Sequence, residues 1–287
     1  MNDQAMSLRR KLQQSKNPKQ AKTISIVSGK GGVGKSNFAL NFSLELLKTQ
    51  KQVLLFDLDV GMGNIDILLG LNAKRTIVDM FDEELKVHDI IEKGPNGLSY
   101  IAAGNGLANF FTMDESRKDY FLEQYNELVQ LYDYIIFDMG AGATQESLFF
   151  IVSSDECIVI TTPEPTSITD AYGMIKHIVN NQSDMPIYLI MNRSLTYKSG
   201  KKSLERFQRV ISQFLNIEIL PMGILPDDRT VSTAVIRQIP YSILNKNAAI
   251  SKALREIVAN YSQNSLKVND KESTSFVQKM KRFLVER

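Results

Sequence analysis

The chain has 287 residues, 43% of them hydrophobic, and a formal net charge of +2 at pH 7. This size and composition predict one large α/β domain with a full core, and the near-neutral charge gives no whole-molecule signal for nucleic-acid binding. The single cysteine, Cys157, excludes an internal disulfide, and with two distant histidines it offers no zinc site.

The chain begins with a polar, basic segment that differs from the rest. Residues 1–22 are followed by β-branched apolar residues and contain the break Lys16-Asn17-Pro18-Lys19. We therefore expect residues 1–22 to be an appended segment, outside a central domain of residues 23–261.

A glycine-rich loop follows the first predicted strand. Residues 23–28 are an apolar strand-like run, residues 37–47 have helical periodicity, and the loop between them fits G-x-x-x-x-G-K-[ST]. A strand, glycine loop and helix in this order point backbone N–H groups at a phosphate chain. This pattern predicts a nucleoside triphosphate site, in which Lys35 reaches the β- and γ-phosphates and Ser36 ligates Mg²⁺. The candidate nucleotide-binding residues of the loop are Gly29, Lys30, Gly31, Gly32, Val33, Gly34, Lys35, Ser36 and Asn37.

Acidic residues follow two further predicted strands. The strand at residues 53–57 ends in Asp57, with Asp59 two positions later, and the strand at residues 134–138 ends in Asp138. Carboxylates at the C-terminal ends of parallel strands face the crevice where α/β sheets bind ligands. We expect Asp138 to hold Mg²⁺ through water, and Gly140 and Gly142 to let the following loop move toward the γ-phosphate.

Apolar strand-like runs alternate with helical segments along the rest of the chain, which predicts a single doubly wound, mostly parallel sheet flanked by helices. The further predicted strands are 98–102, 157–161, 187–191 and 217–224, and the predicted helices are 113–131, 167–181, 201–215, 230–236 and 248–261.

A base-recognition residue is expected at the same edge of the sheet. Asn192 ends the predicted strand at 187–191, where its amide can meet a purine or simply form a turn. A guanine site usually contains N-K-x-D, whereas this chain has Asn192-Arg193-Ser194-Leu195. The sequence therefore favours ATP over GTP.

The string Lys30-Gly31-Gly32-Val33-Gly34-Lys35-Ser36 resembles the deviant P-loop of the MinD/ParA family. This resemblance implies an ATPase that forms a nucleotide-sandwich homodimer, with Lys30 reaching the partner's phosphates. It also implies that Asp59 orients the attacking water, that Asp57 supports the magnesium shell, and that Asn64 and Asp66 end the same element. Adenine recognition by Asn192 and by the loop containing Pro226, Asp227 and Asp228 is implied in the same way.

The C-terminal residues 276–287 form a basic amphipathic pattern. Four cations against Glu286 leave a charge of +3, and the apolar positions lie on one helical stripe. After a linker predicted at residues 262–275, this pattern indicates an anchor for anionic membrane lipid, or a helix docked on its own core. The apolar candidates are Phe276, Val277, Met280, Phe283 and Leu284.

The N-terminal segment resembles the D-Q-A-x-x-L-R element of the flagellar FlhG (FleN/YlxH) branch of the MinD/ParA family. This resemblance implies a protein that regulates flagellar number and placement, stimulates the FlhF GTPase through Gln4, and contacts C-ring proteins of the FliM/FliY/FliN type. The residues that carry it are Asp3, Gln4, Ala5, Leu8 and Arg9.

Two other members of the family remain as alternatives. One is a MinD-like ATPase of division-site placement, and the other is a ParA-like ATPase that partitions DNA. The N-terminal element disfavours the first, and we expect no DNA partner. Since no run of 18 apolar residues occurs and the start is no signal peptide, we expect a cytoplasmic protein that binds the inner face of the cell membrane reversibly.

Overall fold

The computed structural model describes residues 20–59, 63–104, 115–142, 145–181, 184–265 and 276–285. The predicted partner-binding residues of the N-terminal segment lie outside these ranges. For residues 281–285 only the backbone is described, so the predicted membrane contacts of Phe283 and Leu284 also lie outside the description.

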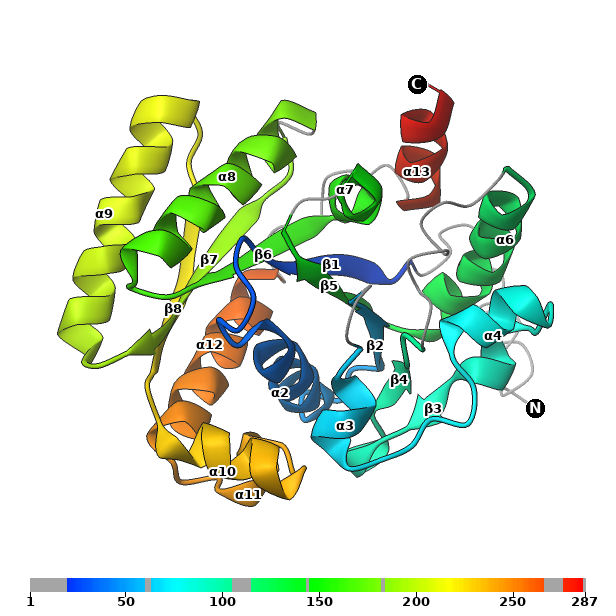
Figure 1. Ribbon diagram of the computed structural model, residues 1–287, viewed down its shortest axis with the longest axis horizontal. Helices are drawn as coiled ribbons and strands as arrows, with labels where there is room; N and C mark the ends of the chain where they lie inside the picture. Colours follow the sequence, from blue (N-terminus) through cyan, green and yellow to red (C-terminus); the bar gives the residue numbers. More distant parts are fainter. Residues whose placement is uncertain are drawn as a thin grey trace, which may run out of the picture.

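The described residues form one eight-stranded sheet in the order β3-β4-β2-β5-β1-β6-β7-β8 (Figure 1). Every pairing is parallel except that of β3 with β4, at one edge. This topology confirms the predicted doubly wound, mostly parallel sheet. The strands are β1 (Lys22–Ser28), β2 (Val53–Leu58), β3 (Glu92–Lys93), β4 (Ser99–Ile101), β5 (Tyr134–Ala141), β6 (Glu156–Thr161), β7 (Ile187–Ser194) and β8 (Leu220–Pro226).

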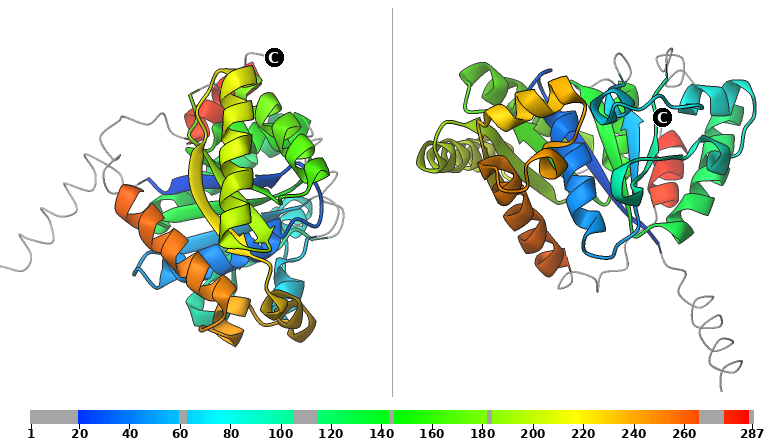
Figure 2. Two further views of the ribbon diagram at one scale, coloured as in Figure 1. Left: turned by 90° about the vertical axis from the view of Figure 1, so that its left-hand side faces the viewer. Right: turned by 90° about the horizontal axis from the view of Figure 1, so that it is seen from below.

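Helices cover both faces of the sheet (Figures 1 and 2). One group contains α2 (Lys35–Leu47), α3 (Ile65–Leu69), α10 (Arg229–Arg237), α11 (Tyr241–Leu244) and α12 (Ala249–Ser265). The other contains α4 (Ile77–Asp82), α6 (Glu115–Leu131), α7 (Gln145–Ser153), α8 (Pro165–Asn181), α9 (Tyr197–Leu215) and α13 (Phe276–Val285).

The strand sequences explain why both faces are covered. In β5, Ile135 and Phe137 belong to one buried apolar cluster, whereas Ile136 between them belongs to the other. Successive side chains of a strand point to opposite faces, so a continuous apolar run supplies a core on each side.

The predicted strands and helices agree with the structure to within a few residues. The largest differences at helix ends are four residues: α9 begins at Tyr197, before the predicted residue 201, and α12 continues to Ser265, into the predicted linker. Tyr261 in the last turns of α12 is buried and donates a hydrogen bond to Glu156, which keeps this part of the helix on the core. The sequence analysis did not predict the short helices α3, α4, α7 and α11.

The C-terminal helix α13 is docked on the sheet beside α7 (Figure 1). Phe276, Val277 and Met280 are buried, and the Phe276 ring lies 4.5 Å from the Tyr125 ring and 5.3 Å from the Phe137 ring, between centroids. Of the two alternatives for the C-terminal residues, a membrane anchor or a helix docked on its own core, the structure therefore shows the docked helix. No helix in the described part of the chain is long and apolar enough to cross a membrane.

Candidate nucleotide-binding site

The predicted phosphate loop connects β1 to α2 at the C-terminal edge of the sheet. It lies at the central strand, flanked by β5 and β6. Gly34 has a φ of 97°, in the left-handed region that favours glycine, and a Cβ there would lie 2.5 Å from Asn192 Nδ2. The loop can therefore bring backbone N–H groups close to a ligand, at the N-terminus of a 13-residue helix.

Lys35 comes together with Asp138, which was predicted to hold Mg²⁺, and with Asp59, which was predicted to orient the attacking water. Lys35 Nζ lies 2.6 Å from Asp138 Oδ1 and 3.8 Å from Asp59 Oδ2. Lys35 and Asp138 are buried, so this ion pair is largely shielded from solvent. Lys35, predicted to bind phosphates, is thus paired with Asp138, predicted to hold Mg²⁺. A phosphate chain must therefore compete with Asp138 for Lys35.

The residues around Asp138 suit a hydrated Mg²⁺. Asp138 Oδ2 is buried and has no hydrogen-bond partner among the described residues. Ser36 Oγ lies 3.3 Å from Lys35 Nζ, next to the same carboxylate. Because a buried carboxylate oxygen without a donor is costly, a metal-bound water is a fitting partner for it.

Asp57 organises the loop that follows β2. Its Oδ1 accepts a hydrogen bond from Asp59 N–H at 3.1 Å, and its Oδ2 accepts from Asn64 and Ile65 N–H at 2.8 and 3.1 Å. Burial, together with the nearby Asp138 carboxylate, raises the pKa of Asp57 to about 7. The contacts show a structural role for Asp57, and its part in the magnesium shell stays a prediction.

Lys30 contacts residues at the start of α8. Its Nζ lies 3.3 Å from Glu164 Oε2 and 3.0 Å from Thr166 Oγ1. The side chains of Lys30 and Glu164 are 40% and 65% exposed, so the contact is weak and easily exchanged.

A pocket of about 590 Å³ opens beside the phosphate loop and is lined by all of the predicted base-recognition residues. Asn192 and Pro226 line it together with Asp227, while Asn192 Nδ2 donates a 2.8 Å hydrogen bond to Val33 O in the loop. Asp228 caps α10 by accepting from Thr230 N–H at 2.8 Å. The pocket and the phosphate loop share Gly34, so one ligand can fill both.

Sequence reasoning missed several residues of this pocket. Residues of α2, α10 and α11 contribute apolar walls, and Arg193 lines the pocket with a φ of 52°. Phe38, Arg193, Leu225 and Arg229 each adjoin a predicted site residue, which was a possible signal. The other missed residues come from α10, α11 and α12, which are distant in sequence from the loop. The missed lining residues are Phe38, Arg193, Leu225, Arg229, Val231, Ser232, Val235, Ile236, Tyr241 and Ile250.

The comparison with protein families agrees with this geometry. The ParA family model, described as an NUBPL iron-transfer P-loop NTPase, matches residues 19–262, which contain the phosphate loop and the base pocket. The chain belongs to the MinD/ParA family of P-loop NTPases. Nucleoside triphosphate hydrolysis is the activity of this family.

Individual relatives narrow the position of the chain within the MinD/ParA family. The chain is 32% identical to the flagellum site-determining protein YlxH of Helicobacter pylori, over 91% of this chain and 86% of that protein. It is 29% identical to the antiactivator FleN of Pseudomonas aeruginosa, over 75% and 77%. The septum site-determining protein MinD of Bacillus subtilis is 30% identical, over 91% and 97%. The predicted resemblance to the FlhG (FleN/YlxH) group is confirmed.

Solved structures of MinD proteins share the fold. The Aquifex aeolicus cell division protein MinD has a TM-score of 0.67 and 26% identity, covering 85% of this chain and 97% of its own. Pyrococcus horikoshii MinD, complexed with Mg-ADP, has a TM-score of 0.68 and 20% identity, covering 87% and 99%. Nucleotide and Mg²⁺ are therefore bound by a protein of the same fold.

Proposed function

We propose that this protein is an ATP-driven switch that dimerises with ATP, binds membrane, and regulates flagellar number and placement. The arrangement of Lys35, Asp59 and Asp138 at the glycine loop is the observation that supports the ATPase step. The flagellar part rests on the similarity to FleN and YlxH.

ATP is the nucleotide that the pocket favours. One N–H of Asn192 Nδ2 is bonded to Val33 O, and the Oδ1 of the same amide is an acceptor that can meet a base. An acceptor at this position pairs with the 6-amino group of adenine and faces the 6-carbonyl group of guanine unfavourably. Loss of discrimination between the two bases on substitution of Asn192 tests this assignment.

Hydrolysis needs positioning and charge rather than a covalent protein intermediate. Lys35 binds the β- and γ-phosphates, Asp59 orients the water, and Ser36 and Asp138 hold Mg²⁺, which neutralises charge on the phosphates. Asp59 lies near Lys35, which supports its position at the γ-phosphate. Lys30 completes the site of the partner in the dimer.

The dimer is tested with Asp59→Ala and ATP. This variant keeps ATP binding, loses turnover and accumulates as a dimer in size-exclusion chromatography with light scattering. Lys35→Ala is the matched control, which stays monomeric because it does not retain ATP. A monomeric Asp59→Ala protein with ATP bound would contradict the dimer switch.

Membrane binding is assigned to α13. The helix is docked on the core in this structure, and we propose that ATP-driven dimerisation releases it. A single short helix is a marginal anchor, so two copies in a dimer supply the avidity. Sedimentation with anionic liposomes should show ATP-dependent binding that is lost on deletion of residues 275–287. Equal binding without these residues would refute this role.

The flagellar role is assigned to the N-terminal segment. A peptide of residues 1–22 should accelerate GTP hydrolysis by FlhF, and the same peptide with Gln4→Ala should not. A pull-down with ATP-bound Asp59→Ala protein then tests the C-ring partners, because it should recover flagellar proteins of the FliM/FliY/FliN type. Recovery of division proteins or DNA instead would favour one of the two alternative functions.

A further inference from the structure

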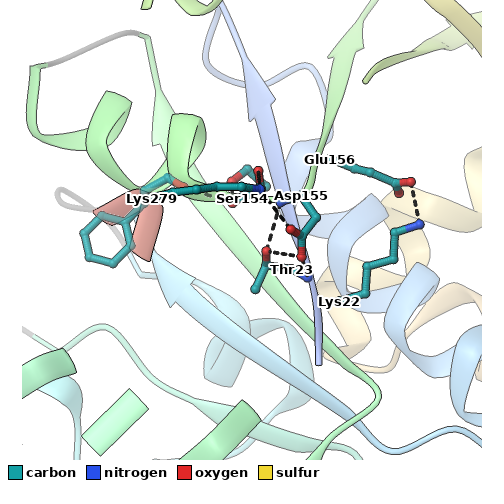
Figure 3. A network of polar contacts seen from close by, with 8 residues as sticks. Lys22, Thr23, Ser154, Asp155, Glu156 and Lys279 are labelled. Carbon is teal, nitrogen blue, oxygen red and sulfur yellow. Dashed lines mark hydrogen bonds and ion pairs between the residues drawn. The ribbon is translucent and has the colours of Figure 1, made fainter. Parts of the chain in front are cut away.

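Contacts from both ends of the chain meet at Asp155, between α7 and β6 (Figure 3). Its Oδ2 accepts hydrogen bonds from Thr23 N–H at 2.9 Å and from the Thr23 hydroxyl at 2.8 Å. Its Oδ1 accepts from Lys279 Nζ of α13, also at 2.9 Å. One carboxylate therefore holds both the start of β1 and the C-terminal helix.

The backbone strengthens each half of this contact. Asp155 N–H donates to the Thr23 hydroxyl at 2.9 Å and to Thr23 O at 3.1 Å. Lys279 Nζ also donates to Ser154 O at 3.3 Å. The side chains of Lys279 and Asp155 are 20% and 19% exposed, so their ion pair is partly desolvated and stronger than a fully exposed one.

The neighbouring Glu156 makes a separate set of contacts. Glu156 Oε1 pairs with Lys22 at 2.5 Å, and Oε2 accepts from the Tyr261 hydroxyl at 2.6 Å. Figure 3 shows the Lys22 pair set apart from the contacts of Thr23 and Lys279. Glu156 therefore offers a matched control, because it carries the same charge one position away and holds a different helix.

The geometry points to a specific role for Asp155: it latches α13 in the docked position and couples release of this helix to loosening of the first residues of β1. The apolar contacts of Phe276 and Met280 hold α13 on the core, while the Lys279–Asp155 pair fixes its position by one directional contact. Residues 1–21 precede β1 in the chain, so the latch connects the helix proposed to bind membrane to the segment proposed to act on FlhF. The roles of α13 in membrane binding and of the N-terminal segment in stimulating FlhF rest on the proposed function. The coupling between the two rests on the contacts of Asp155 alone.

Helix α7 links this latch to the nucleotide site. It begins at Gln145, three residues after Gly142 of the loop that follows Asp138, and it ends at Ser153, two residues before Asp155. Helix α13 packs directly on α7. A shift of α7 caused by nucleotide would therefore move Asp155 relative to Lys279 and weaken the latch.

Hydrogen–deuterium exchange on the full chain, without nucleotide or lipid, tests the latch. Asp155→Asn keeps an acceptor for Thr23 N–H but loses the charge that holds Lys279. We expect exchange in residues 276–285 to accelerate about fivefold and exchange at the start of β1 to rise with it. Lys279→Met should give the same pattern without touching the Asp155 side chain. Glu156→Gln should leave residues 276–285 unchanged.

Each result decides one part of the inference. Unchanged exchange in residues 276–285 of both Asp155→Asn and Lys279→Met would overturn the latch. Faster exchange in α13 with an unchanged β1 in both variants would overturn the coupling.

Sedimentation with phosphatidylglycerol vesicles separates the latch from the membrane role. Nucleotide-free Asp155→Asn should bind about fivefold more than the wild type, because its α13 keeps all its cations and is released more often. If no variant binds vesicles with or without ATP while exchange changes as expected, the membrane role fails and the latch stands.

Discussion

Phe276, the first residue of α13, stacks on Phe137, and Phe137 directly precedes Asp138 in β5. The ring centroids lie 5.3 Å apart, whereas Asp138 contacts Lys35 on the other side of the strand. One short stretch of β5 thus contributes both to the candidate magnesium site and to the surface that holds the C-terminal helix.

Truncation of Phe276 should loosen α13. Phe276→Ala removes a buried ring that contacts Tyr125 and Phe137, and we expect a loss of about 2–4 kcal/mol in the stability of the docked helix. Faster hydrogen exchange in residues 276–285 is the measurement. Gln278→Ala, at an exposed position of the same helix, is the control and should change nothing.

Substitution of Lys35 should weaken nucleotide binding strongly. Lys35→Ala removes a charge-assisted contact to the phosphates, which is worth about 1.5–3 kcal/mol, or roughly 10- to 150-fold in affinity. Isothermal calorimetry with Mg-ATP measures the change. Unchanged affinity would contradict the assignment of the glycine loop. Circular dichroism controls for folding, because the variant leaves the buried Asp138 without its cation.

Asn192→Ala should reduce the preference for adenine. The variant loses the amide that faces the base pocket, so we expect the ratio of ATP to GTP affinity to fall about tenfold. Competition with a fluorescent ATP analogue gives both affinities. Equal losses for the two nucleotides would show that Asn192 supports the loop through Val33 and does not read the base.

The nucleotide-free protein should lose stability as the pH rises across the titration of Asp57. Its pKa is raised from 3.8 in the unfolded chain to about 7 in the folded one. Between these values the folded protein retains a proton that the unfolded chain has released, so this group favours folding at low pH and less so as the pH increases. Urea unfolding at pH 5 and pH 7 measures the effect. Asp57→Asn should show a smaller decrease than the wild type over this range, and an equal decrease in both would contradict the assignment.

The central site was predictable because its residues are close in sequence to regular elements. Lys35 belongs to a loop with fixed spacing, and Asp138 ends an apolar strand, so their meeting follows from a parallel sheet. The apolar runs of β5 and β6 likewise identified a sheet buried on both faces.

Other features depend on contacts between distant segments and gave no sequence signal. The pair of Asp155 with Lys279 joins residues 124 positions apart, and the walls of the base pocket come from α10 and α11. Helix α4 did carry a local signal, a capping box of Thr76 and Asp79, but six residues are too few to show helical periodicity. The short α7 contains an unbroken apolar run at residues 148–152, which hides its helical period in the same way.

The position of Lys30 has a consequence for how two molecules first meet. Lys30 contacts Glu164 and Thr166 of its own molecule. These contacts are solvent-exposed and yield at little cost, so in the proposed dimer the triphosphate of a second molecule can draw the lysine away. When two molecules without nucleotide meet, no phosphate competes for Lys30. Its contacts with Glu164 and Thr166 then persist and disfavour a dimer that contains no nucleotide.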